Sequence, residues 1–259
     1  MKRGGKMIGK FITDRGRVRT HNEDSGGLYY NKDDQFLAVI ADGMGGHRAG
    51  DVASQMATDF IGEKWRETTH FISPEAVEKW LSKVLKKANQ SILKKAQKNK
   101  ECQGMGTTVV ISVCTDEFIS IAHIGDSRCY MLSEEGFKQV TEDHSLVNEL
   151  LRTGQISESD AEHHPRKNVL LKALGTEENV QADIKSLGWE KNNKLLLCSD
   201  GLANKVLNEE LADYVKQDKN IQEIVQDLVE LANERGGEDN VSLAIIQHKS
   251  PDQVGDDPC

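Results

Sequence analysis

The sequence predicts an α+β protein with a four-layer α-β-β-α sandwich, in which two antiparallel sheets pack face to face and helices lie outside. Apolar runs typical of strands come mostly in adjacent pairs along the chain, and amphipathic helical segments also come in adjacent pairs. This order differs from the βαβα alternation of a doubly wound fold. Several runs are bounded by Gly and Asp, as buried strands that end at loops are. Two packed sheets covered by helices would bury all of these runs.

Composition limits the class of protein and its partners. The chain has 259 residues, 37% hydrophobic and 29% charged, as in a globular protein. A formal net charge of −9 argues against nucleic acid as a partner. We expect a single domain over residues 1–250, because no convincing linker interrupts it, followed by a flexible acidic tail over 251–259.

Cysteine use and hydropathy indicate a cytoplasmic protein without membrane insertion. The five cysteines are scattered and include no C-x-x-C pair, which favours reduced thiols over disulfides or a zinc site. The basic stretch 1–10 is followed by no long apolar segment, so a signal peptide is not expected. No run reaches the roughly 18 apolar residues of a membrane span.

The elements can be placed from periodicity and end signals. Ser73 and Pro74 suit the N-cap and first position of a long helix, with lysines toward its end. A glycine-rich loop over 44–50 opens the helix before it. Other helices are expected at 146–152, 157–162 and 221–232, and strands at 28–30, 36–41, 107–114, 118–124, 129–132, 195–199 and 241–247. The stretch 141–176 is otherwise irregular, and loops of this length are usually functional.

Acidic residues recur where the predicted strands begin or end. Asp42, Asp126 and Asp200 follow three apolar runs, and Asp239 precedes a fourth. Each motif alone favours a simple turn, since Asp-Gly is a strong turn signal. Antiparallel neighbours, however, place one strand's exit beside another's entry, so these acids could share one end of a sheet. Gathered carboxylates repel one another unless a cation joins them, and oxygen ligands suit Mg²⁺ or Mn²⁺.

Six motifs together resemble those of the metal-dependent protein phosphatases of type 2C, in the family's order and over nearly the whole chain. The stretch from Asp143-His144-Ser145 through His164-Pro165-Arg166 resembles the bacterial branch that opposes Hanks-type Ser/Thr kinases, and most of all the enzymes of Bacillus-like bacteria. The six motifs are Arg19-x-x-Asn22-Glu23-Asp24, Ala41-Asp42-Gly43-Met44-Gly45-Gly46-His47, Gly104-Met105-Gly106-Thr107-Thr108, Gly125-Asp126-Ser127-Arg128, Ser199-Asp200-Gly201 and Glu238-Asp239-Asn240.

The resemblance implies a ligand set for two Mn²⁺ or Mg²⁺ ions. Asp42 would bridge the ions and the Gly43 carbonyl would bind one of them, since glycine lets the backbone approach closely. Asp200 and Asp239 would bind the second ion, and Asp126 with Asp200 would hold a weaker third. Acidic or amide side chains around these ligands would act indirectly, by holding metal-bound water or orienting the ligands. They are Glu23, Asp24 and Asn240.

The implied mechanism needs no protein nucleophile. Water bridging two divalent ions loses a proton near neutral pH and attacks phosphorus in line. Arg19 matches the phosphate clamp, because its guanidinium fork fits phosphate oxygens. Met44 stands where animal-type members carry His, so a general acid could be His47, water on the third ion, or neither. His123 would have at most a supporting role.

These expectations describe a cytoplasmic, monomeric protein serine/threonine phosphatase. Its partners would be phosphorylated proteins, including a membrane-anchored Ser/Thr kinase. The stretch 141–176 would be a flap over the site, whose His163, His164, Arg166 and Lys167 could contact a phosphopeptide or simply be solvated. Two alternatives remain at this stage: a pseudophosphatase that binds phosphoproteins without turnover, and a phosphatase of an anti-anti-sigma factor.

Overall fold

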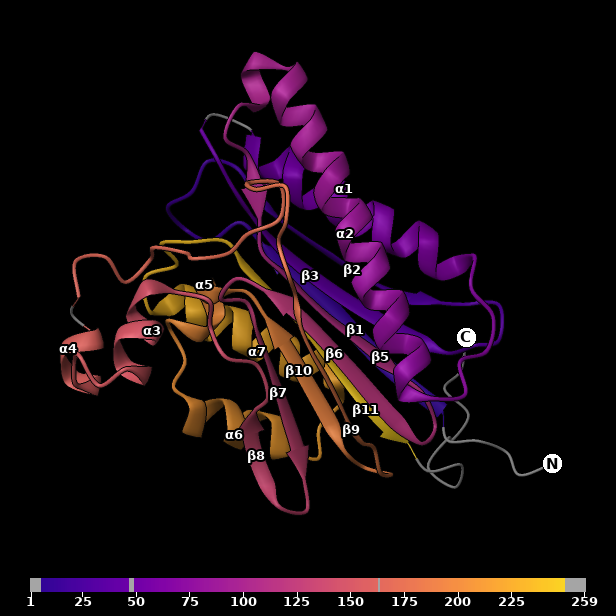
Figure 1. Ribbon diagram of the computed structural model, residues 1–259. Coiled ribbons are helices and arrows are strands. Elements are labelled where there is room, and N and C mark those ends of the chain that lie inside the picture. The colour runs from indigo at the N-terminus through magenta and orange to yellow at the C-terminus, as the bar shows by residue number, and fades with distance from the viewer. Residues whose placement is uncertain (1–5, 47–48, 163, 250–259) are drawn as a thin grey trace.

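The computed structural model describes residues 6–46, 49–162 and 164–249, and within them two antiparallel sheets form the centre of the protein (Figure 1). The first sheet has the strand order β1-β11-β10-β7-β8, and the second the order β2-β3-β5-β6-β9, with β4 paired to the end of β3. The strands of the first sheet are β1 (Lys6–Asp14), β11 (Val241–Lys249), β10 (Lys194–Cys198), β7 (Arg128–Ser133) and β8 (Gly136–Gln139). Those of the second are β2 (Asp24–Tyr30), β3 (Phe36–Met44), β5 (Val109–Cys114), β6 (Phe118–Ile124), β9 (Asp183–Gly188) and the short β4 (Gly106–Thr107).

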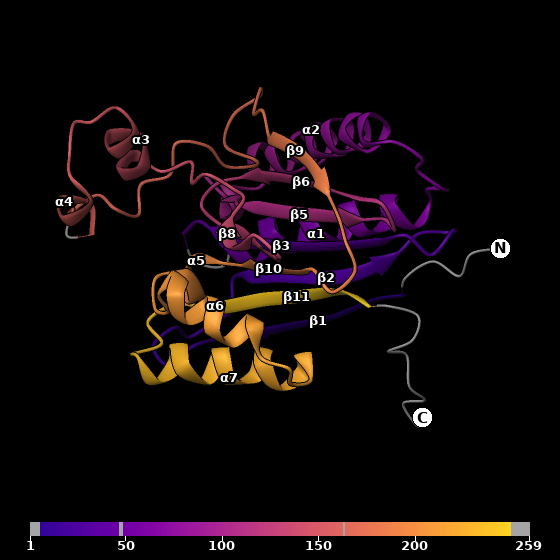
Figure 2. The same cartoon turned by 90° about the horizontal axis from the view of Figure 1, so that it is seen from below.

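Helices cover the outer face of each sheet, so the predicted four-layer α+β class is confirmed. Figure 2 shows the layers edge-on, with α1 (Ala49–Arg66) and α2 (Pro74–Lys98) on the second sheet. The first sheet is covered by α5 (Asp200–Ala203), α6 (Asn208–Lys216) and α7 (Ile221–Glu234). A 3-10 turn, η1 (Lys100–Cys102), follows α2. Helices α3 (Leu146–Arg152) and α4 (Glu158–Glu162) project to one side of the sandwich (Figure 1).

The strands read as continuous apolar runs because both faces of each central strand are buried. On β3, Leu37 and Val39 pack toward α1 and α2, while Ala38 and Ile40 pack between the sheets. Alternate residues of a strand point to opposite faces, so each run supplies two apolar layers at once. Three buried clusters result: one under each helical layer and one between the sheets.

The start of α2 follows the predicted signals. Ser73 caps α2 by accepting a hydrogen bond at its hydroxyl from the Ala76 N–H at 3.4 Å, and Pro74 takes the first helical position. Asn220 caps α7 in the same way, through Gln222. These caps satisfy backbone donors that have no partner within the helix.

Several elements were not predicted. The basic N-terminal stretch contributes an edge strand, β1. Met7, Phe11 and their neighbours pack against β11 and into the clusters on the two faces of the first sheet. Strands β8 and β9 are also edge strands, whose exposed polar residues hide the apolar alternation. Helix α6 was missed as well, although Leu211 and Val215 form its buried face.

Two further predictions concern residues that lie partly or wholly outside the described part of the chain. Cys102, Cys114, Cys129 and Cys198 are free and buried, as expected for reduced thiols, whereas Cys259 lies outside the described residues. The acidic tail expected over 251–259 also lies outside them. No helix within residues 6–46, 49–162 and 164–249 has the length and apolar content needed to cross a bilayer.

Candidate active site

Acidic side chains meet at one end of the layer between the two sheets. Asp42 lies near the end of β3, in phase with Ala38 and Ile40, whose side chains enter that layer. Asp24, the first residue of β2, is directly opposite Asp42 in the strand register. The Ser199 hydroxyl reaches across from the other sheet and donates a hydrogen bond to Asp24 Oδ2 at 2.8 Å. The two sheets therefore contribute jointly to this cluster.

Asp200 and Asp126 complete the buried part of the cluster. Asp200 opens α5 directly after β10, and its carboxyl group lies within hydrogen-bonding reach of the Asp42 carboxyl. Asn204 donates to Asp200 Oδ2 at 3.1 Å, while Oδ1 is buried without a hydrogen-bond partner in the described part of the chain. Asp126 lies in the turn after β6, close enough to Asp200 for their charges to interact.

The environment of these carboxyls opposes their ionisation. Burial is the main cause, followed by repulsion from neighbouring carboxylates, and together they raise the pKa of Asp24 and of Asp126 to about 7. Burial and the same repulsion raise the pKa of Asp42 well above its ordinary value and also raise that of Asp200. A fully ionised cluster would thus need a compensating positive charge.

Glycine is required beside Asp42 because the backbone is crowded there. A Cβ atom on Gly43 would fall 2.5 Å from the Glu23 carbonyl oxygen and closer still to that of Gly50. The Gly43 N–H donates to the Glu23 carbonyl at 3.0 Å. The start of β2, the end of β3 and the start of α1 therefore meet at this residue.

Arg19 and Asp239 lie at the open edge of the cluster. Arg19 Nη2 is 2.8 Å from Asp239 Oδ2, and Arg19 Nε donates to the Glu238 carbonyl at 3.3 Å. Both side chains are more than a third exposed. The negative charge of Asp239 nevertheless contributes to the raised pKa of Asp42, so Asp239 belongs to the same electrostatic cluster.

The Asn240 side chain joins the segments that carry these residues. Its Oδ1 accepts from the Glu23 N–H at 2.8 Å, and its Nδ2 donates to the carbonyls of Arg15 and His21 at 2.8 and 3.0 Å. Asn240 is buried, so three otherwise unsatisfied backbone groups depend on it. The side chain of Glu23 has a raised pKa, mainly through partial burial.

A partly buried ion pair close to Asp126 was not predicted. Arg128 Nη2 lies 2.8 Å from Asp143 Oδ2, and Arg128 Nε donates to Asp143 Oδ1 at 3.0 Å. Burial acts to lower the pKa of Arg128, but the Asp143 carboxylate outweighs it and raises that pKa. The pair joins β7 to the start of the stretch 141–176. Both residues occur in the quoted motifs, yet nothing in their spacing reveals that they meet.

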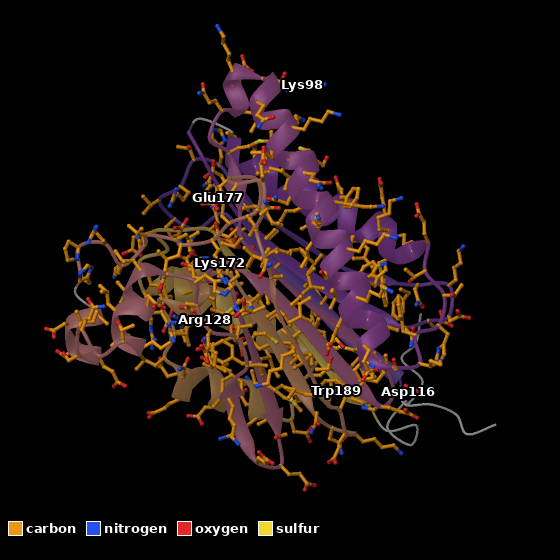
Figure 3. The ribbon with its side chains drawn as sticks, viewed as in Figure 1. Lys98, Asp116, Arg128, Lys172, Glu177 and Trp189 are labelled. Carbon is orange, nitrogen blue, oxygen red and sulfur yellow. The ribbon has the colours of Figure 1, made fainter. Side chains whose placement is uncertain are left out.

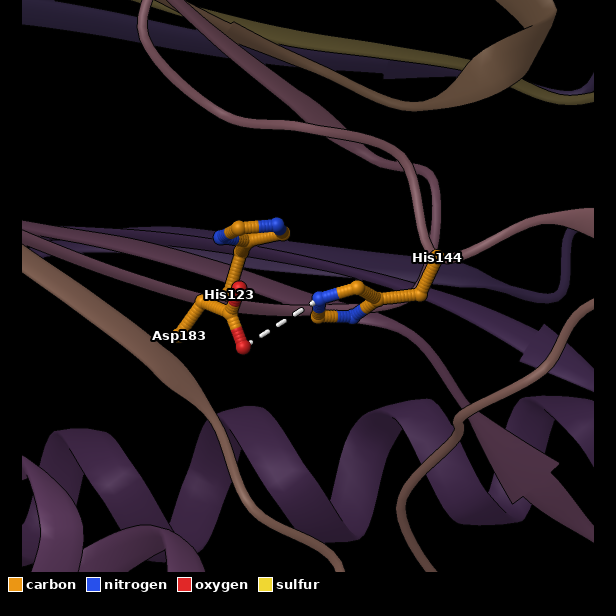
Figure 4. Close-up of side chains that lie close together, drawn as sticks. All are labelled: His123, His144 and Asp183. Carbon is orange, nitrogen blue, oxygen red and sulfur yellow. Dashed lines mark ion pairs between the residues drawn. The ribbon is translucent and has the colours of Figure 1, made fainter. Parts of the chain in front are cut away.

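A second group of titratable side chains lies beside the Asp126 turn (Figure 4). His144, His123 and Asp183 come from three different segments, with the two imidazole rings stacked at 4.6 Å. His144 Nδ1 accepts from the Gly125 N–H at 3.1 Å, which places the proton of the neutral ring on Nε2, facing Asp183 at 3.4 Å. Lys172 Nζ is also 3.4 Å from that nitrogen.

The contacts of His144 favour a structural role for this group over metal binding. Three potential ligand atoms lie within 4.8 Å of one another. A cation there would compete with the Lys172 ammonium and with the proton on His144. Burial lowers the pKa of His144, and the neighbouring His123 and Lys172 lower it further against the opposing effect of Asp183, which favours the neutral ring. Through the contacts of His144 with Gly125 and Lys172, this group holds Lys172 (labelled in Figure 3) near the turn that carries Asp126.

The predicted histidine donor and the flap are described only in part. His47 and His163 lie outside the described residues. Arg166 and Lys167 are exposed, on the connection after α4. The base of the stretch 141–176 is anchored by backbone hydrogen bonds between Leu174 and Thr107.

Comparison with known proteins gives the family. The family model described as Protein phosphatase 2C matches residues 13–242. A serine/threonine phosphatase, stp, of Listeria welshimeri is 46% identical over 241 residues, which are 93% of this chain and 96% of that protein. The crystal structure of the serine/threonine phosphatase Stp1 from Staphylococcus aureus superposes with a TM-score of 0.90 at 36% identity, covering 96% of this chain and 98% of the other.

A further solved structure of the same fold contains metal ions. The catalytic domain of the serine threonine protein phosphatase PstP, in complex with two manganese ions, has a TM-score of 0.82 at 29% identity and covers 94% of this chain and 99% of its own. These matches confirm the resemblance stated from the motifs and the predicted class of enzyme. The chain belongs to the protein phosphatase 2C family and is a bacterial-type protein-serine/threonine phosphatase.

Proposed function

We propose that this phosphatase hydrolyses phosphoserine and phosphothreonine in proteins with two Mn²⁺ or Mg²⁺ ions held by the acidic cluster, and that a third ion binds more weakly. Asp42 and the Gly43 carbonyl would hold one ion, Asp42 would be shared with the second, and Asp200 and Asp239 would complete the second site. Asp126, with Asp200, would hold the third. The observation that carries this proposal is the convergence of acidic side chains from both sheets, where burial first and mutual repulsion second raise the pKa of Asp24, Asp42, Asp126 and Asp200.

The donor set fits a hard divalent cation. The ligand atoms are carboxylate and carbonyl oxygens, as Mn²⁺ and Mg²⁺ prefer. Asp200 Oδ1 is buried and lacks a hydrogen-bond partner among the described residues, so an ion there would satisfy it. Because Gly43 has no Cβ, backbone oxygens can approach it closely, whereas a larger residue would push the chain away. PstP, with two manganese ions, has the same fold.

Bound ions would supply the Lewis acidity that makes water a nucleophile near neutral pH. The protein's own residues would position the reactants. Arg19 would bind phosphate oxygens, since its contacts with Asp239 and Glu238 use only two of its N–H groups. Asp24, with a pKa of about 7, can hold or release a proton beside Asp42. Glu23, whose backbone Asn240 fixes, would orient water at the edge of the cluster.

The proposed partners are phosphorylated proteins, including a membrane-anchored Ser/Thr kinase of the Hanks type, encountered in the cytoplasm by a monomeric phosphatase. The relatives support the substrate class, because stp and Stp1 are named serine/threonine phosphatases. The kinase is proposed from the resemblance of the bacterial motifs.

The ligand assignment can be tested by two substitutions with a matched control. We expect Asp42→Asn and Asp239→Asn each to abolish Mn²⁺-dependent hydrolysis of p-nitrophenyl phosphate, because each removes a negative ligand oxygen. Asp213→Asn, an exposed position on α6, removes the same charge away from the cluster and should keep wild-type activity. Circular dichroism would check that all three variants fold. Full activity in either site variant would refute the assignment, and an inactive wild type with added Mn²⁺ would favour a phosphoprotein-binding role without turnover.

A further inference from the structure

The loop that joins β1 to β2 carries an unusual density of positive charge. In a chain of net charge −9, residues 15–19 place Arg15, Arg17 and Arg19 at alternate positions. All three residues are exposed. The proposed function uses only Arg19, so Arg15 and Arg17 have no assigned role.

Backbone contacts hold this loop in place beside the acidic cluster. The N–H groups of Arg17 and Val18 both donate to the Gly237 carbonyl, at 2.7 and 3.2 Å. Asn240 holds the Arg15 carbonyl at 2.8 Å. Gly16 adopts φ +80°, and a Cβ there would collide with the Asp239 carbonyl oxygen. The positive charges are therefore mounted on a fixed backbone, which limits the entropy lost when a ligand binds.

The acidic side chains of the facing segment, Glu238 and Asp239, already pair with cations other than Arg17. Glu238 forms an ion pair with Lys205, and Asp239 pairs with Arg19. Among the described residues, neither Arg15 nor Arg17 has an ion-pair or hydrogen-bond partner for its guanidinium group. Val18, between Arg17 and Arg19, leaves 64% of its surface exposed, so the loop presents an open face.

Building on the proposed function, we propose that this loop recognises acidic side chains that flank the phosphorylated residue of the substrate, with Arg17 as its main contact. Arg17 and Arg19 are two residues apart, so their Cα atoms are at most about 7.6 Å apart. An extended substrate advances roughly 3.3 Å per residue, which places a side chain about two residues from the phosphorylated one within this range. The favoured substrates would then be phosphopeptides rich in Asp or Glu near the target residue.

A second reading is that Arg17 only offsets the negative charge of the metal ligands. The two roles predict different kinetics. A general electrostatic effect would change the hydrolysis of all substrates by the same factor, whereas recognition would change the ratio between acidic and neutral substrates.

The test uses two phosphothreonine peptides that differ only in their flanking residues, glutamate in one and glutamine in the other. We expect Arg17→Glu to lower the ratio of kcat/KM for the acidic peptide to that for the neutral peptide by at least about threefold, the scale of one exposed charge pair. The effect should shrink in 1 M salt, where the screening length falls to about 3 Å. Lys98→Glu, at the far end of α2 (Figure 3), makes the same change in net charge and should leave the ratio at its wild-type value.

Each outcome bears on a separate claim. An unchanged ratio in Arg17→Glu, or an equal fall in Lys98→Glu, would overturn the recognition role while leaving the phosphatase activity intact. A wild type that hydrolyses neither peptide with Mn²⁺ would instead refute the proposed function, and this inference with it. Melting temperatures of both variants would establish that exposed substitutions left the fold unchanged.

Discussion

The Asp24–Asp42 pair shows how single residues create the cluster. Two carboxyl groups face each other across neighbouring strands, an arrangement that destabilises a sheet when both are charged. Hydroxyl donors compensate only in part: Ser199 bonds Asp24, and Ser242 assists. The fold retains this unfavourable pair at the end of the layer between the sheets. Carboxyl groups whose pKa is raised by burial and by neighbouring carboxylates are typical of functional sites.

Gly43 provides a test of the backbone crowding around the cluster. We expect Gly43→Ala to lower the melting temperature and to weaken Mn²⁺ binding, because the added methyl group would force apart the carbonyl oxygens of Gly50 and Glu23. Overpacking of this kind typically costs about 1–3 kcal/mol. Thermal unfolding and calorimetric Mn²⁺ titration would measure the two effects.

Gly46 supplies the matched control for that substitution. It lies three residues further on, in the bend after β3, its φ is not in the left-handed region, and no atom lies within 4 Å of a Cβ built there. Gly46→Ala should therefore change neither stability nor Mn²⁺ affinity appreciably. Equal behaviour of the two variants would show that the crowding at Gly43 does not matter.

At the scale of elements, the sequence predicts what is local or repetitive. The central strands, the cap at Ser73 and the hairpin of β5 and β6 follow from apolar runs and end signals. Edge strands β1 and β9 escape prediction because they face solvent on one side and mix Lys and Ser with their apolar residues. Their strand structure depends on pairing with β11 and β6, which lie far away in the sequence.

The same distinction applies to the cluster. That Asp42, Asp126 and Asp200 would lie together could be predicted, since each stands at the end of an apolar run. The contact of Arg128 with Asp143 and the three backbone bonds of Asn240 could not, because they depend on loop conformations that no periodicity encodes. Short loops are set by packing against distant segments, so their side-chain partners appear only in three dimensions.

Strands β1 and β11 carry a pH-dependent element away from the cluster. His248 on β11 is opposite Met7, is buried, stacks on Trp189, and has no hydrogen-bond partner for its ring nitrogens among the described residues. Burial lowers the pKa of His248 below its ordinary 6.5, although Asp116 and the Glu190 backbone act in the opposite direction. The unfolded chain then binds a proton more readily than the folded one.

The sign of the pH effect follows from that difference. The contribution of a neutral His248 is fully present above the unfolded pKa of about 6.5 and is lost as the pH falls below it. Relative to His248→Phe, which keeps a ring against Trp189, we expect the wild type to lose free energy of unfolding between pH 7.5 and 5, because the carboxyl groups of the acidic cluster contribute equally to both proteins. Urea unfolding at the two pH values would measure this difference. Equal changes in both proteins would contradict the prediction.

At the scale of the whole molecule, each sheet supplies different residues to the acidic cluster in the layer between the sheets. The second sheet supplies Asp24 and Asp42, while the first supplies the strands that lead into Asp200 and out of Asp239. A cation bound among them would join the two halves of the sandwich. Its binding free energy would add to the stability of the whole fold, because the unfolded chain has no such site.

This coupling predicts a thermal shift that depends on both metal and pH. At a Mn²⁺ concentration of 100 times Kd, binding to the folded state alone adds about 2.7 kcal/mol, which for a chain of this size corresponds to roughly 5–10 °C in melting temperature. Asp42→Asn should lose most of this shift, whereas Asp213→Asn should keep it. Differential scanning calorimetry with and without Mn²⁺ would measure it.

Protons should compete with the metal for the same carboxyls. Burial and mutual repulsion raise the pKa of Asp24 and Asp126 from 3.8 to about 7, so at pH 6 the folded protein without metal holds protons that the unfolded chain has released. Without metal, stability should thus fall as the pH rises from about 4 to about 7, since the folded state binds more protons there. Mn²⁺ must displace these protons to bind, so the metal-induced shift should be larger at pH 8 than at pH 6. A shift independent of pH would mean that the ions bind away from the buried carboxyls.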